Sequence, residues 1–323
     1  MICLKRLLKK ILPPPVNAFN REVERILSSI QNEHKINNQN YLDLIQKNVV
    51  LQQRIVALEK TIIHLEKTTE QLKLNAREST QSSEQMMRSL QDHTKIAKEL
   101  RGIQLESLWA NIFQDTIAES VWLKNRCFSP GRWAAGYPFL YILYRVLNDV
   151  HPKRILELGL GQTTHMIGQY ADAFDDVQHM VIEHDSEWIS FFKRSSSLGK
   201  NTHLLKLELE ESVYLEDQSV LSYQGFAQAL QGRKFDLISI DGPFGGTAKI
   251  YSRVDILRLL PECLSDSFVI LLDDMNRGGE QRTAARMEQR LKDSRIAYKT
   301  GRYVGQKETR IWTSEDWRFL CSL

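Results

Sequence analysis

The first 120 of the 323 residues contain very few of the residues that build a packed core or a tight turn. They hold one Trp, two Phe, one Tyr and one Gly, whereas the rest of the chain holds nearly all of the aromatic residues and glycines. Aromatic side chains supply much of the apolar area of a core, and glycine permits tight turns. This division predicts a fibrous N-terminal half and a globular C-terminal half.

Other absences exclude whole classes of protein. No apolar run reaches the roughly 20 residues of a membrane-spanning helix, and no apolar region with a cleavage site follows the first residues. The cysteines lie far apart, without the close spacing of zinc sites or small disulfide scaffolds, which fits a reducing cytoplasm; they are Cys3, Cys127, Cys263 and Cys321. The net charge of +3, from 43 basic and 40 acidic residues, is too balanced to indicate nucleic acid as the main partner.

Residues 1–15 form a basic amphipathic N-terminal segment. Its apolar residues Leu4, Leu7, Leu8 and Ile11 share one helical face, basic residues occupy the rest, and three prolines at 13–15 end the pattern. Such a helix can lie among the headgroups of anionic lipid, and the alternative is a solvated terminus. We expect residues 1–12 to make peripheral contact with the inner face of the membrane.

Residues 20–105 carry a heptad pattern. The a positions are Tyr41, Asn48, Ile55, Ile62, Thr69 and Ala76, and the d positions are Leu44, Leu51, Leu58, Leu65 and Leu72. Beta-branched residues at a with Leu at d favour a parallel two-stranded coiled coil, and one Asn at a, here Asn48, fixes the register. Arg54 at g and Glu59 at the following e position would pair between chains.

The alternative to a coiled-coil dimer is a helical hairpin within one chain. No Gly or Pro interrupts the run between Val23 and Arg101, so the sequence offers no clear place for the chain to turn back. We therefore predict a parallel homodimer through residues 20–105, followed by a helical connector over residues 106–127.

The C-terminal domain, residues 128–323, shows an alternating α/β pattern. Short apolar runs alternate with longer stretches that permit helices; the runs cover 154–158, 179–183, 203–209, 235–240 and 268–272. This alternation is typical of parallel strands with helical crossovers, whose ligands bind at the carboxyl ends of the strands. Residues directly after each run are therefore the candidate site.

The first two strand ends carry the pattern of a nucleotide-type cofactor site. ELGLG places Glu157, Gly159 and Gly161 at the first strand-to-helix turn, where a cofactor lying against the backbone leaves no room for a side chain. Glu183 ends the second strand in IEHD, 24 residues beyond Gly159, where a carboxylate can accept both ribose hydroxyls. A dinucleotide fold would prefer a third glycine at the position of Thr164.

Acidic residues follow the two later strands. Asp241 lies in IDGPFGG after the run 235–240, and Asp273 and Asp274 lie in LLDD at the end of the run 268–272. The acids at 273 and 274 could equally cap the next helix or meet solvent. Their place at strand ends makes them candidates for the reacting part of the site.

These four motifs, in this order, resemble the class I S-adenosylmethionine (SAM) dependent methyltransferases over about 60% of the chain. The resemblance implies a Rossmann-like α/β domain, here preceded by a long helical coiled coil, with Glu157, Gly159 and Gly161 at the methionine part of SAM and Glu183 at its ribose. The pair IDG and LLDD resembles O-methyltransferases found with bacterial polysaccharide biosynthesis and, more distantly, the catechol type, in which such acids hold Mg²⁺.

The resemblance also implies roles in methyl transfer. Asp241 would lie beside the transferred methyl as the catalytic residue, and with Asp273 and Asp274 it would bind Mg²⁺ if the reaction uses a metal. Asp274 stands where the catechol type has Asn, which leaves metal dependence open. Without a metal, Asp241 or a histidine such as His184 would act as the base.

Other residues around these motifs could meet the acceptor or could pack or face solvent. Tyr251 and Arg253 could bind an acidic or phosphorylated acceptor, and Trp133 and Tyr137 could stack on a sugar or cover SAM. The expected function is O-methylation of a glycan or lipid-linked glycan. The alternatives are a non-catalytic coiled-coil scaffold, a nicotinamide-dependent oxidoreductase and a nucleic-acid methyltransferase.

Overall fold

The computed structural model describes residues 16–323 apart from 132, 197, 215–217 and 246–249. The basic segment predicted over residues 1–15 lies outside the described residues. The chain divides into two compact units, Met1–Leu90 and Gln91–Leu323. Among the described residues, no helix combines the length and the apolar character that crossing a bilayer requires.

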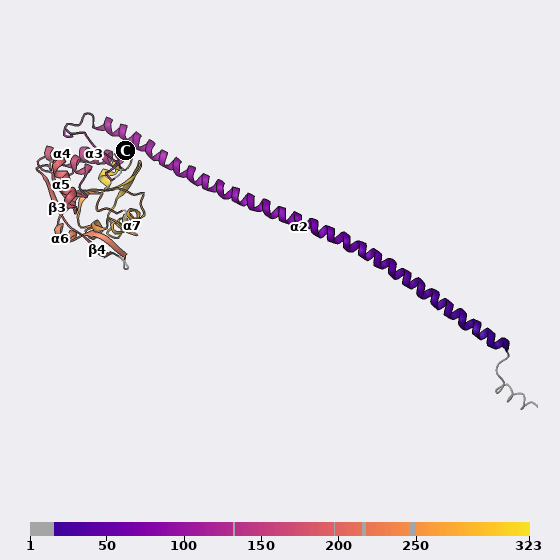
Figure 1. The fold of residues 1–323 in the computed structure, drawn as a ribbon. Coiled ribbons are helices and arrows are strands. Elements are labelled where there is room, and N and C mark those ends of the chain that lie inside the picture. The colour runs from indigo at the N-terminus through magenta and orange to yellow at the C-terminus, as the bar shows by residue number, and fades with distance from the viewer. Residues whose placement is uncertain (1–15, 132, 197, 215–217, 246–249) are drawn as a thin grey trace, which may run out of the picture. The chain divides into compact units, whose positions relative to one another are not determined.

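The first unit contains the part of the long helix α2 (Val16–Ile117) up to Leu90, and the rest of α2 belongs to the second unit (Figure 1). Every residue from 21 to 90 is exposed, including the apolar d positions Leu44, Leu51 and Leu58. Helices normally gain stability by burying an apolar face, so this face lacks a partner in the described chain. The predicted long helix is confirmed, while its pairing with a second chain stays a prediction.

In the second unit, the end of α2 is part of the core. Phe113 and Ile117 are buried, and Trp109 Nε1 donates a hydrogen bond of 3.0 Å to the Val304 carbonyl. The Glu106 carboxylate accepts from the backbone N–H of Tyr137 at 2.6 Å. The helical connector predicted over 106–127 is helical only as far as Ile117, and its apolar residues pack into the second unit because they continue the core.

A seven-stranded sheet forms the centre of the second unit. Its strands are β1 (Arg154–Leu158), β2 (Gln178–Glu183), β3 (Thr202–Lys206), β6 (Phe235–Ile240), β7 (Leu264–Leu272), β8 (Lys299–Val304) and β9 (Glu308–Thr313). The order is β3-β2-β1-β6-β7-β9-β8. The first five strands run parallel, and β9 is antiparallel to both β7 and β8. The order reverses between β1 and β6, which is where such sheets bind ligands.

Helices cover both faces of the sheet. The remaining elements are α3 (Tyr137–Val150), α4 (Gln162–Ala173), α5 (Ser186–Ser195), α6 (Phe226–Ala229), η1 (Asp255–Arg258), α7 (Gly278–Asp293), η2 (Glu315–Cys321) and a hairpin of β4 (Leu209–Tyr214) and β5 (Gln218–Tyr223). Strand residues alternate between two cores. Ile155 and Leu237 face the core shared by α2, α3 and α4, whereas Leu156 and Ile238 face the core shared by α6, η1 and α7.

This architecture confirms the predicted fold class, a Rossmann-like α/β domain after a long helix. The predicted runs 154–158 and 235–240 match β1 and β6, and the other three runs overlap β2, β3 and β7. The predicted run 203–209 extends past the end of β3 at Lys206 into the start of the β4–β5 hairpin. That hairpin was not predicted.

Candidate functional site

Two glycines let the loops after β1 and β6 touch each other. Gly159 has a φ of +100°, and a Cβ there would lie 3.0 Å from the backbone N of Gly242. A Cβ at Gly242 would lie 2.8 Å from the Cα of Gly159. No side chain fits at either position without moving backbone, so glycine at both positions is what brings the two strand ends together.

A cavity of about 630 Å³ opens at these strand ends. Its lining comes from the loop after β1, the ends of β2 and β6, the start of α4, the loop after β7, Arg253, and five residues before α3, namely Ser129, Gly131, Trp133, Ala134 and Ala135. The volume lies in the range of small-molecule sites, and the cavity lies where the strand order reverses. Gly161 lies on its wall, and a Cβ there would meet no described atom within 4 Å, so the space beside this backbone is open.

Glu183, at the end of β2, is held firmly on the wall of the cavity. Its Oε2 accepts a 3.0 Å hydrogen bond from Leu160 N, and its Oε1 accepts from the N–H groups of His184 at 2.7 Å and Asp185 at 3.0 Å. Burial on its own would raise the pKa of Glu183, but the His184 ring and these N–H groups outweigh it and hold the pKa below its usual value. The site therefore presents a fixed, ionised carboxylate.

Glu157 is placed differently from the expectation. Its side chain does not line the cavity; Oε2 lies 2.9 Å from Nε2 of His179, and the other ring nitrogen of His179 lies 3.1 Å from Thr202 Oγ1. Ile155 of β1 pairs with His179 of β2, so their side chains lie on the same face of the sheet. Glu157 is two residues beyond Ile155 in β1, so its side chain lies on that face as well. Glu157 Oε1 is buried with no hydrogen-bond partner among the residues that the structure describes.

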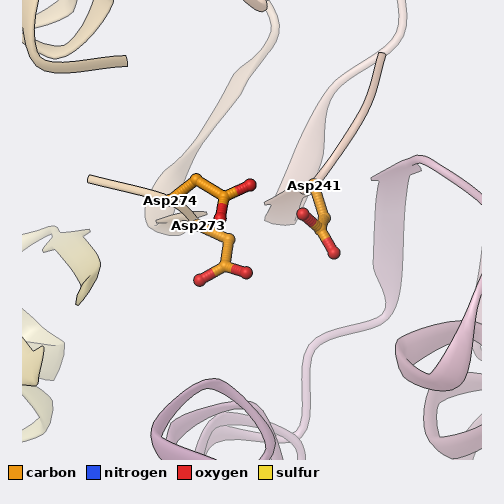
Figure 2. Close-up of side chains that lie close together, drawn as sticks. All are labelled: Asp241, Asp273 and Asp274. Carbon is orange, nitrogen blue, oxygen red and sulfur yellow. The ribbon is translucent and has the colours of Figure 1, made fainter. Parts of the chain in front are cut away.

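The three aspartates predicted as a metal set do come together. Figure 2 shows Asp241 at the end of one strand and Asp273 and Asp274 at the end of its neighbour, and their ligand atoms lie within 4.8 Å of one another. Asp241 and Asp274 line the cavity, whereas Asp273 lies behind them, fully buried. The Asp273 carboxylate accepts a 2.9 Å hydrogen bond from the Thr309 hydroxyl.

Three cationic side chains contact these carboxylates: Arg253, Lys307 and Arg277, whose Nη1 lies 2.9 Å from Asp274 Oδ2. Arg253 Nη2 lies 3.2 Å from Asp241 Oδ1 and 2.8 Å from Asp274 Oδ2. Lys307 Nζ lies 3.4 Å from Asp273 Oδ2 and 3.3 Å from Asp274 Oδ1, and it donates to the Ala134 carbonyl at 2.9 Å. Arg253 and Lys307 each bridge two of the three aspartates, whereas Arg277 joins Asp274 to Glu280 of α7.

The charges shift the pKa values of the group. Burial, with the Asp273 carboxylate adding to it, raises the pKa of Asp241 to about 7, and burial raises the pKa of Asp273 as well. Burial alone would lower the pKa of Arg253, but the carboxylates of Asp241 and Asp274 outweigh it and raise the pKa. The guanidinium is thus a permanent charge at the floor of the cavity.

The arrangement does not fit a divalent cation. A Mg²⁺ ion needs oxygen ligands at about 2.1 Å in octahedral geometry. Here carboxylate oxygens of Asp241 and Asp274 already accept hydrogen bonds from Arg253. An ion among the three acids would also lie within a few ångströms of three positive side chains, since Lys307 and Arg277 contact the same acids. Two unit charges 4 Å apart repel by about 4 kcal/mol at an effective dielectric constant of 20, and a divalent ion doubles this.

Aromatic side chains surround the opening of the cavity. Trp133 is 77% exposed and lies against Phe244, with ring centroids 5.0 Å apart. Trp188 donates a 2.6 Å hydrogen bond from Nε1 to the Leu160 carbonyl, which fixes its ring on the cavity wall. Exposed, cavity-facing rings of this kind offer flat apolar surface to a ligand.

The structure thus brings most of the predicted site residues to one cavity. Those lining it are Gly159, Gly161, Glu183, His184, Asp241, Arg253, Asp274 and Trp133, whereas Glu157, Asp273, Tyr137 and Tyr251 do not line it. Sequence reasoning missed Lys307, which lies between β8 and β9 and carried no motif, and Trp188. For Trp188, the one available signal in the sequence was its position five residues after the end of β2.

Comparisons with known proteins agree with the fold only in outline. No protein-family model matches the chain, and no curated protein sequence matches it.

Similar solved structures include the O-methyltransferase TomG from Streptomyces achromogenes in complex with SAM (14% identity, 65% of this chain and 98% of that chain, TM-score 0.40). They also include the SAH-bound Podospora anserina methyltransferase PaMTH1 (14% identity, 69% and 94%, TM-score 0.36) and a methyltransferase from Pyrococcus furiosus (16% identity, 64% and 96%, TM-score 0.36). At these TM-scores the likeness carries no argument about function, and the fold rests on the strand order.

Proposed function

We propose that this protein is a SAM-dependent methyltransferase that transfers the methyl group to a hydroxyl oxygen. The observation that carries the proposal is the fixed carboxylate of Glu183 on the wall of a cavity that also exposes the backbone at Gly159 and Gly161. A carboxylate at the end of the second strand is suited to accept both hydroxyls of a ribose.

The rest of the cavity matches the other parts of SAM. The N-terminus of α4, at Gln162 and Thr163, lines it and presents backbone N–H groups that favour the carboxylate of the methionine part. Trp188, which lines the cavity, would offer apolar surface to the nucleoside. If Glu183 holds the ribose, Asp241 is the carboxylate of the same cavity that would be available to the reacting groups.

Methyl transfer to oxygen needs alignment of donor and acceptor and removal of one proton. The attack is an in-line displacement, so holding both groups in one cavity supplies much of the rate. Asp241 lines the cavity, and its raised pKa, about 7, makes it a suitable acceptor for the proton of an attacking hydroxyl. His184, whose pKa is raised by Glu183, is committed to that carboxylate and is less suited to the task.

The acceptor is proposed to be a glycan or a lipid-linked glycan. Support comes from Trp133 and Phe244, whose exposed rings at the cavity opening offer flat surfaces on which a sugar ring can stack. A substitution of Trp133 by Ala should therefore weaken acceptor binding while SAM binding persists. Loss of SAM affinity in that variant would instead assign Trp133 to the cofactor.

The alternative function is a non-catalytic scaffold, and the exposed apolar face of α2 is the observation that favours it. The two functions differ in whether the cavity binds SAM. Calorimetric titration of SAM and of NAD⁺ into the full-length protein tests this, with Glu183→Gln as the site variant and Glu187→Gln as the matched control on the exposed side of α5. SAM binding weakened only by Glu183→Gln supports the methyltransferase. A folded protein that binds no SAM contradicts it: binding of neither ligand favours the scaffold, and binding of NAD⁺ alone favours an oxidoreductase.

We also propose that α2 pairs with α2 of a second copy in parallel. Its support is the run of exposed apolar d positions, such as Leu51 at 52% and Leu58 at 63% exposure, and the complementary charges of Arg54 and Glu59 across the seam. In sedimentation equilibrium of the full chain, the native protein should be a dimer and Leu51→Lys should shift it toward monomer. Gln53→Lys, at the outward f position, is the control; a monomeric native protein at micromolar concentration would refute the dimer.

Membrane contact through residues 1–12 stays a prediction, since this segment lies outside the described residues. Removal of residues 1–15 should abolish sedimentation with anionic vesicles if the segment is a peripheral anchor. Unchanged sedimentation of the shortened chain would dispose of the anchor.

A further inference from the structure

Arg253 lies where the predicted metal ion would lie. It follows the loop after β6 and adopts a φ of +55°, a conformation that side-chain-bearing residues rarely adopt, so its placement costs free energy that its contacts must offset. Its side chain is 2% exposed yet lines the cavity. A residue held in this way is fixed by its surroundings rather than by local preference.

Every nitrogen of the guanidinium faces an oxygen. Nη2 contacts Asp241 and Asp274, Nη1 donates 3.1 Å to the carbonyl of Asp273, and Nε donates 3.3 Å to the carbonyl of Pro243. These contacts come from the ends of two neighbouring strands, β6 and β7, and Nε also lies 3.8 Å from the buried carboxylate of Glu280 in α7. The planar donor fork thus ties together the same strand ends that a shared cation would join.

We infer that Arg253 is a built-in substitute for the divalent cation: it holds Asp241 and Asp274 in place, and the protein binds no metal ion among Asp241, Asp273 and Asp274. Lys307, which contacts Asp273 and Asp274, and Arg277, which contacts Asp274, complete the set of positive charges around the acids. The inference rests on the proposed function for its meaning in catalysis, where the guanidinium supplies the positive charge beside the attacking hydroxyl. Whether Arg253 takes the place of a metal ion can be tested without measuring methyltransferase activity.

Mn²⁺ is the probe, because free and bound Mn²⁺ differ in their electron paramagnetic resonance signal. The native full-length protein should bind no Mn²⁺ up to about 1 mM, the weak end of the range for protein carboxylate sites, and Mg²⁺ should leave its melting temperature unchanged. Arg253→Met should melt at a lower temperature, and Mn²⁺ or Mg²⁺ should restore part of the loss because the cation replaces the missing guanidinium. Arg233→Met, in the exposed turn before β6, should show neither effect.

Arg253→Lys keeps one positive charge and should remain unable to bind Mn²⁺. If Arg253→Met does not fold, the native protein and Arg253→Lys still decide the matter. Tight Mn²⁺ binding by the native protein that is lost in Asp274→Asn would overturn the inference. Failure of the native protein to bind SAM would count against the proposed function instead, since Mn²⁺ binding is measured without SAM.

Discussion

Asp255 is a buried acid whose protonation should control the stability of the second unit. It begins η1, its side chain is fully buried, and its Oδ1 accepts a 2.8 Å hydrogen bond from Tyr223 N. Its Oδ2 has no hydrogen-bond partner among the described residues. Burial raises the pKa of Asp255 to about 6, against partial compensation by the Tyr223 N–H and by Arg258.

The size and sign of the effect follow from this shift. The unfolded chain loses the proton of Asp255 near pH 4, whereas the folded chain keeps it until about pH 6, so the free energy of unfolding falls as the pH rises through that window and stays lower above it. A shift of about 2 pKa units corresponds to about 3 kcal/mol. Asp255→Asn keeps an acceptor for Tyr223 N and removes the charge, so the variant should be more stable than the native protein by about 2 to 3 kcal/mol at pH 7.5.

The measurement is urea unfolding followed by tryptophan fluorescence at several pH values between 4 and 7.5. All six tryptophans lie between residues 109 and 317, so the signal reports the second unit. At pH 4 the Asp255 side chain is protonated in the folded protein, so its Oδ2 is a buried donor, as the side-chain nitrogen of Asn is. The two proteins should therefore be equally stable at this pH. The gap should open between pH 4 and pH 6.

Asp266→Asn, on the exposed start of β7, is the control for the loss of one acidic residue. The reasoning about Asp255 would be refuted by a stability gap that is the same at pH 4 and pH 7.5, since a constant gap reports packing and not ionisation. It would also be refuted by a less stable Asp255→Asn at pH 7.5.

Two further predictions concern the backbone contact at the cavity and the end of α2. Gly159→Ala should lower the free energy of unfolding by about 1 to 3 kcal/mol and abolish SAM binding, because the φ of Gly159 is +100° and a Cβ there would lie 3.0 Å from Gly242 N. Urea unfolding checks the first effect and calorimetry the second, and unchanged SAM affinity would contradict the close approach of the two loops. Phe113→Ala should cost about 3 to 5 kcal/mol in the same unfolding assay, because Phe113 is fully buried in the second unit. Phe19→Ala, at a position that is 60% exposed, should leave the tryptophan transition unchanged.

The strand ends were predictable because parallel strands carry their own signal. Buried strands of this kind read as short apolar runs, which is why the bounds of β1 and β6 could be taken from sequence. Gly159 and Asp241 directly follow such runs and Glu183 ends one. The parallel strands of one sheet end at one edge, so the meeting of these residues at one cavity follows from the pattern.

Contacts between distant segments were not predictable. Lys307 reaches Asp273 and Asp274 only because β9 returns antiparallel beside β7, and nothing near residue 307 in the sequence announces that pairing. Glu157 was expected at the cofactor, but its orientation depends on which face of β1 it occupies and on His179 of β2, which offers it a hydrogen-bond partner. Heptad spacing could predict α2 but could not show that its last turns, at Phe113 and Ile117, pack into the globular unit.

The central claim is that the cavity binds SAM through Glu183. The most direct test is to measure by calorimetry the affinity for SAM of the full-length native protein and of its Glu183→Gln variant. The account predicts that native binding is weakened about tenfold or more by Glu183→Gln, the size expected for hydrogen bonds to a charged group, while Glu187→Gln binds SAM as the native protein does. A folded native protein that binds no SAM, or equal affinity in all three proteins, would contradict the account.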